Sequence, residues 1–144
     1  CNNYTCAILY KIISNSIDLS TRTFYYITDK STIYTSIKRL AELDIMFNLE
    51  LIKQVCSDIQ DQEKIQDNTS IKLAMYKIQE TIELLNKELN YIYENIKDHE
   101  NKYFHNWRAL DISTNIELVE KLNTVLLHRY NILIDLLKIY YRRY

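Results

Sequence analysis

Neither glycine nor proline occurs among the 144 residues of the chain. Hairpin turns, bulges and glycine-rich phosphate-binding loops depend on these residues, so β-sandwiches, barrels and nucleotide-binding folds are excluded. The formal net charge of −1 gives no basic field that would favour nucleic acid as a partner. No run of about 18 apolar residues predicts a transmembrane segment.

These exclusions predict an all-α fold: a four-helix-type bundle with one short and three long helices and coiled-coil-like packing. With 47% hydrophobic residues, the chain has enough apolar material for one core, and we expect a single domain over residues 1–144. Because the sequence begins at Cys1 without an initiator methionine, we expect an excised or processed fragment.

The short helix is predicted at the N-terminus, over Tyr4–Ile17, where apolar residues cluster. The next stretch, Asp18–Lys30, contains the run Phe24-Tyr25-Tyr26-Ile27, and such aromatic and β-branched residues favour a strand locally. Since no partner strand is evident, we expect this run to cap the bundle or to begin the second helix.

The second helix is predicted from Ser31 to about Gln60, and the polar segment Ser57–Asn68 is the expected connection to the third. Apolar residues recur in the second helix at three- and four-residue steps, as on one face of a helix. They are Ile33, Ile37, Leu40, Leu43, Phe47, Leu51, Val55 and Ile59.

The third helix carries an unbroken heptad seam, roughly 50 Å long at 1.5 Å per residue. Isoleucine at the d positions disfavours a parallel dimer, and further apolar residues widen the face, so we expect the seam inside the bundle. Pairing of the seam between chains is the alternative. The a positions are Met75, Ile82, Leu89, Ile96 and Tyr103, and the d positions are Ile71, Ile78, Leu85, Ile92 and His99.

The last helix is predicted to begin at a capping box formed by Thr114 and Glu117 and to run toward the C-terminus. Its segment from Ile132 to Tyr141 is apolar almost all round. A helix of this kind lies centrally in a bundle or is covered by a partner.

Two groups of residues are candidates for partner binding. Phe104, Trp107 and Arg108 lie where the third helix is expected to end, and tryptophan and arginine are enriched at binding hot spots. The alternative is that Trp107 plugs the end of the bundle. Leu137 and Tyr141 represent the apolar last helix. Contact of this helix with a membrane surface is not expected.

Two charged residues, Asp44 and Arg129, fall at positions where the helical patterns predict apolar residues. One interpretation is that they pair across the bundle and fix its register, a role that is better attested for such pairs than stabilisation. The other is that each side chain reaches the rim of the bundle and is solvated there.

Cys1, Cys6 and Cys56 allow a disulfide that would indicate an extracellular or surface location, which we slightly favour over the cytoplasm. The alternative is three free thiols. The three histidines lack the Glu-x-x-His spacing of helical di-iron sites, so neither a metal nor another cofactor is expected. Because no acid, base and nucleophile converge in the pattern, we do not expect an enzyme.

The sequence therefore predicts a non-enzymatic helical module for protein interaction or structure. The high isoleucine, asparagine and tyrosine content is typical of an AT-rich genome, which would suit a viral or parasite surface or secreted protein that binds a host or assembly partner. A self-assembling coiled-coil component is one alternative, and a cytokine-like or fusion-type bundle is another.

Overall fold

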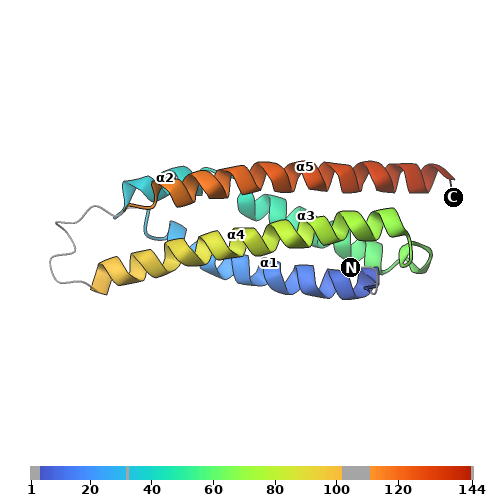
Figure 1. Cartoon of the computed structure of the whole chain (residues 1–144), viewed down its shortest axis with the longest axis horizontal. Coiled ribbons are helices and arrows are strands. Elements are labelled where there is room, and N and C mark those ends of the chain that lie inside the picture. The colour runs from blue at the N-terminus through green and yellow to red at the C-terminus, as the bar shows by residue number, and fades with distance from the viewer. Residues whose placement is uncertain (1–3, 32, 102–110, 144) are drawn as a thin grey trace.

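The computed structural model describes residues 4–31, 33–101 and 111–143, and all of its regular structure in these ranges is helical. It confirms an all-α bundle of helices packed along one another (Figure 1). The elements are α1 (Cys6–Thr28), α2 (Thr35–Ala41), α3 (Ile45–Gln60), the short 3₁₀ helix η1 (Glu63–Ile65), α4 (Thr69–Asn101) and α5 (Ser113–Arg143).

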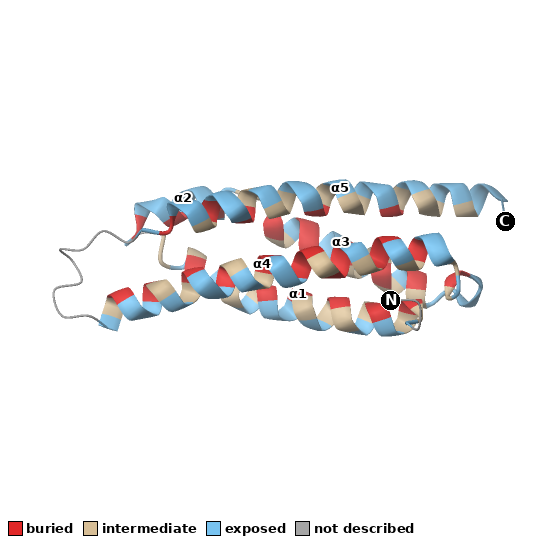
Figure 2. Ribbon diagram, viewed as in Figure 1, coloured by how far each residue is buried: buried red, intermediate tan, exposed pale blue. Residues whose placement is uncertain are grey.

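Helix α4 packs against both α1 and α5 along one face and is exposed to water along the other. Every described residue of the predicted heptad seam is at most 8% exposed, from Ile71 at its start to His99 at its end. The prediction of the third helix and its buried face is thus confirmed, while Tyr103 lies outside the described residues. Figure 2 shows the alternation of buried and exposed residues along α4 that a one-sided seam produces.

The first helix is longer than predicted, because α1 continues through the aromatic run to Thr28. Phe24 and Ile27 are buried on the face that also buries Ile13 and Ile17. The ring of Tyr26 packs edge to face on Tyr93 of α4, with centroids 4.6 Å apart. Packing against α4 therefore outweighs the local strand preference of this run, and the expectation of a cap or a new helix was wrong.

The second predicted helix is two helices, since the helical conformation is interrupted between Ala41 and Ile45. Helix α2 packs on α1 and α5, and α3 packs on the same two helices farther along the bundle. The break lets each segment bury its own apolar residues, among them Leu40 in α2 and Leu49 in α3. The short helix of the bundle is consequently α2 and not the N-terminal one.

The helix starts have local causes. The side chain of Thr5 accepts a hydrogen bond from the Ile8 N–H (3.2 Å) at the start of α1, and Asn68 Oδ1 accepts one from the Ile71 N–H (3.0 Å) at the start of α4. Helix α5 begins at Ser113, where the Ile112 carbonyl accepts the first helical hydrogen bond. Thr114 is therefore inside the helix, and the predicted capping box was wrong by two positions.

Polar contacts between helices fix how the helices sit against one another. The Asn86 side chain on α4 donates to the Ser16 carbonyl (3.1 Å) and accepts from the Ser20 hydroxyl, both on α1. Asn48 on α3 donates to the Asn123 side chain on α5 (3.1 Å). Shifting one helix along its neighbour would leave these partly buried groups without partners, which costs about 1–3 kcal/mol for each group.

The one-sided burial of α4 predicts that substitutions of two adjacent leucines differ greatly in how much stability they cost. Leu85 is fully buried and Leu84 is 49% exposed. We expect Leu85→Ala to lower the free energy of unfolding by about 2–5 kcal/mol, because it leaves a cavity in the core. Leu84→Ala is the matched control and should cost less than about 1 kcal/mol. Urea unfolding followed by circular dichroism measures both, and equal losses would contradict the placement of α4.

Candidate protein-binding site

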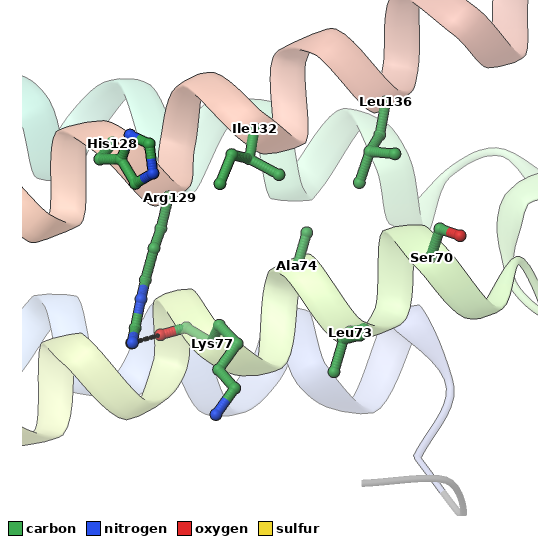
Figure 3. Close-up of a pocket in the computed structure, with 8 residues that line it drawn as sticks. All are labelled: Ser70, Leu73, Ala74, Lys77, His128, Arg129, Ile132 and Leu136. Atoms are coloured by element: carbon green, nitrogen blue, oxygen red, sulfur yellow. Dashed lines mark hydrogen bonds between the residues drawn. The ribbon is translucent and has the colours of Figure 1, made fainter.

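A groove opens on the outside of the bundle between α4 and α5. It has a volume of about 450 Å³, and we call it the outer groove. Apolar side chains from both helices form half of its wall, and Figure 3 shows Ala74 and Ile132 near its middle. The residues that line it are Ser70, Leu73, Ala74 and Lys77 of α4 and His128, Arg129, Ile132 and Leu136 of α5.

Helical periodicity explains why this apolar surface is exposed. Helix α5 buries Val119, Leu126 and Leu133 in the core, at a spacing of seven residues. Ile132 lies beside that stripe, 42% exposed, and Leu73 of α4 is exposed on the other wall. Neither helix can turn these residues inward without exposing its seam, so the apolar wall remains at the surface.

Arg129 crosses the groove at one end and joins its two helices. Its Nη1 group donates to the Lys77 carbonyl (2.9 Å) and to the Thr81 hydroxyl (2.7 Å) on α4, and the first of these bonds is drawn in Figure 3. The same nitrogen lies 3.7 Å from Oε2 of Glu80, which also pairs with Lys77 (3.1 Å). The guanidinium of Arg129 and the ammonium of Lys77 are therefore both bound by groups of α4.

The predicted pair between Arg129 and Asp44 is not formed. Asp44 is exposed and precedes α3, where its carbonyl accepts the Asn48 N–H (3.0 Å). Asp44 therefore lies at the exposed start of a helix and not in the apolar face of one, so the heptad pattern gave it the wrong environment. Arg129 does join two helices, but its partners are a carbonyl and a hydroxyl on α4, which sequence patterns do not single out.

The predicted partner-binding residues have different outcomes. Phe104, Trp107 and Arg108 lie outside the described residues. Tyr141 is exposed near the end of α5, whose last turns extend past the start of α4 (Figure 1). Leu137 is partly buried against the core, and its neighbour Leu136 lines the outer groove instead. The sequence pattern did not predict the α4 wall of the outer groove, although Leu73 stands in the sequence as an apolar residue outside the seam.

The thiols of Cys6 and Cys56 are free and buried in the core. Burial raises the pKa of Cys6 to about 11 and that of Cys56 to about 12, and in both cases the cause is the loss of solvation of the thiolate. The Cys6 thiol donates to the Ile65 carbonyl (3.7 Å). Both groups are neutral at physiological pH, so neither is an activated nucleophile. Cys1 lies outside the described residues.

His99 is buried at the end of the seam. Its Nδ1 lies 2.9 Å from the Tyr34 hydroxyl, and the two rings meet edge to face. Burial also raises the pKa of Tyr34 above its ordinary value. The contact joins α4 to the turn before α2. Within residues 4–31, 33–101 and 111–143, no three His, Cys, Asp or Glu side chains gather as metal ligands would.

None of the helices, over the residues described, is both long enough and apolar enough to cross a membrane. Comparisons of the chain with protein-family models, with curated proteins and with solved structures gave no match.

The role of Arg129 can be measured by a double-mutant cycle with Thr81. We expect Arg129→Met to lower the free energy of unfolding by about 2 kcal/mol, because it removes the hydrogen bonds to the Lys77 carbonyl and the Thr81 hydroxyl. Thr81→Val, which removes the second of these bonds, should lower it by about 1 kcal/mol. The double variant should lose about 1 kcal/mol less than the sum, since both changes remove the same bond. Arg39→Met is the control, because Arg39 pairs with Glu120 instead. Additive losses in the Arg129 cycle would contradict the geometry.

The buried thiols predict a specific pH dependence of alkylation. In a Cys1→Ser variant, the native protein should react with iodoacetamide far more slowly than the chain in guanidinium chloride, because only an accessible thiolate attacks. For Cys6, the native rate should keep rising as the pH passes 9.0, the ordinary pKa, toward about 11. A rate that levels off near pH 9.0, or native labelling as fast as in denaturant, would show that the thiol is exposed.

Proposed function

We propose that the chain is a non-catalytic protein-binding module that holds an amphipathic helix of a partner in the outer groove. The observation that carries this proposal is the shape and chemistry of the groove. Two antiparallel helices form its walls, and aliphatic residues make up half of its lining and come from both helices, which suits the apolar face of a third helix. A partner helix would bury Leu73 and Ile132, which water now contacts.

The dimensions of the groove agree with a helix of about two turns. From His128 to Leu136 the wall on α5 covers nine residues, and the eight steps between them span roughly 12 Å along the helix axis. Apolar residues at i, i+4 and i+7 of a partner would reach along this length. The polar groups at the Arg129 end, including the ammonium of Lys77, would fix the direction in which the partner lies.

The heptad seam of α4 supports this site over an assembly formed through α4 itself. In the bundle, α1 and α5 of the same chain cover the seam, and Ile82 and Leu89 have no exposed surface. A second chain could reach the seam only if α4 first separated from these two helices. The outer faces of α4 and α5 are open to a partner without unfolding, and they include Leu73 and Ile132, which are 50% and 42% exposed.

Site-specific photo-cross-linking in cells that express the chain tests the proposal. A benzophenone amino acid is placed at Ile132, in the groove, and in a second protein at Ile8, on α1. The two positions are matched because both are isoleucines in helices, 42% and 43% exposed. We expect a discrete protein adduct from position 132 and none from position 8. No adduct from position 132, or the same adducts from both, would contradict the proposal.

A further inference from the structure

Four exposed apolar residues on α5 are spaced seven residues apart. Leu118, Val125, Ile132 and Ile139 are 38%, 39%, 42% and 46% exposed, so all four contact water to a similar degree. Scattered exposed apolar residues are normal on a protein surface. A strict seven-residue repeat over four positions is the pattern that winds one helix around another. We call these four residues the outer stripe.

The residues that accompany the outer stripe complete a heptad seam. If the stripe occupies the d positions, Leu122, Arg129 and Leu136 occupy the a positions. The two leucines are partly buried against the core, with a remainder still exposed. The guanidinium of Arg129 is bound to α4, so its aliphatic stem is what faces the seam. Part of this seam is the α5 wall of the outer groove.

Two opposite charges beside the seam lie at equal distances from its midpoint. The g positions of the same heptads hold Lys121, His128, Asp135 and Arg142, all exposed, and Lys121 and Asp135 each lie seven residues from His128. In the described part of the chain, the side chains of Lys121 and Asp135 make no hydrogen bond or ion pair. They are 14 residues apart, or roughly 21 Å along one helix, so they cannot pair with each other within a chain.

An antiparallel second copy of α5 satisfies both features at once. In an antiparallel coiled coil, g positions face g positions of the other helix. With His128 at the two-fold axis, Lys121 of each copy meets Asp135 of the other, which gives two opposite-charge pairs. In the same register, Leu122 lies opposite Ile132, and Leu136 lies opposite Leu118. A parallel arrangement would instead place identical charges at the same level.

We propose that the outer stripe is a homodimer interface in which two copies of the chain pair antiparallel through α5, centred on His128. This deepens the proposed function, on which it rests, by naming the helix that fills the groove: α5 of a second copy. A two-fold interface buries the same patch on both chains, so the patch must be complementary to itself. The opposite charges of Lys121 and Asp135 meet this requirement.

A charge-reversal experiment tests the inference. Sedimentation equilibrium in low-salt buffer, where exposed charges are least screened, gives the dimer dissociation constant. We expect Lys121→Glu and Asp135→Lys each to raise this constant about tenfold, because each turns two attractive pairs into repulsive ones. The double variant K121E/D135K should return to near the wild-type value, since both pairs are restored with their signs exchanged.

Apolar substitutions supply a second, independent measurement. Ile132→Gln should raise the dissociation constant by about tenfold or more, since two copies lose an apolar contact in each dimer. Ile8→Gln, the matched control on α1, should leave it unchanged. Circular dichroism spectra confirm that each variant is folded, which is expected for residues this exposed.

The inference is overturned if the wild-type chain stays monomeric at all concentrations. It is also overturned if Ile132→Gln leaves the dissociation constant unchanged, or if the double charge variant is weaker than either single one. Photo-cross-linking at position 132 separates this failure from that of the proposed function. A monomer that forms an adduct with a different protein overturns the homodimer and keeps the binding module. A monomer without any adduct overturns both.

Discussion

The burial of the α4 seam between α1 and α5 is the constraint on which the rest of the structure depends. Helix α4 has 33 residues and runs most of the length of the bundle. Its apolar face follows a period close to seven residues, and it stays buried only where neighbouring helices lie nearly parallel to it. Helices α1 and α5 meet this condition, and α2 and α3 then close the remaining sides of the core.

The same constraint determines which surface is left for binding. Helix α5 turns Val119, Leu126 and Leu133 toward the core, and this fixes its rotation about its own axis. Its outer stripe then faces water beside α4, next to the groove that Arg129 crosses. The exposed apolar surface of α5 is thus a consequence of how α5 covers the seam, and the proposed partner site follows from it.

The sequence predicted best where a pattern is long and strict. The all-α class and the extent of α4 followed from the absence of glycine and proline and from the heptad repeat. For α1 the sequence also contains the signal of a longer helix, since the step from Ile17 through Ser20 to Phe24 continues a helical face. A serine within that face interrupted the apolar pattern, and its bond to Asn86 on α4 explains why it is buried there.

What sequence reasoning missed depends on contacts between residues far apart in the chain. The break between α2 and α3 contains no glycine or proline, and it arises from packing on two neighbouring helices. The partners of Arg129 include a backbone carbonyl, which carries no sequence signature. The groove likewise needs two walls from α4 and α5, so neither helix alone reveals it. For the segment around Trp107, which lies outside the described residues, the prediction stands as a prediction.

Hydrogen exchange of backbone amides, measured over a range of protein concentrations, tests most directly whether the α4 seam is buried within one chain. We expect amides in the middle of α4, around Ile82 and Leu89, to be among the slowest to exchange even at the lowest concentration, because α1 and α5 of the same chain cover them. If their protection disappeared on dilution, the seam would be formed between chains, and the fold described for the single chain would be contradicted.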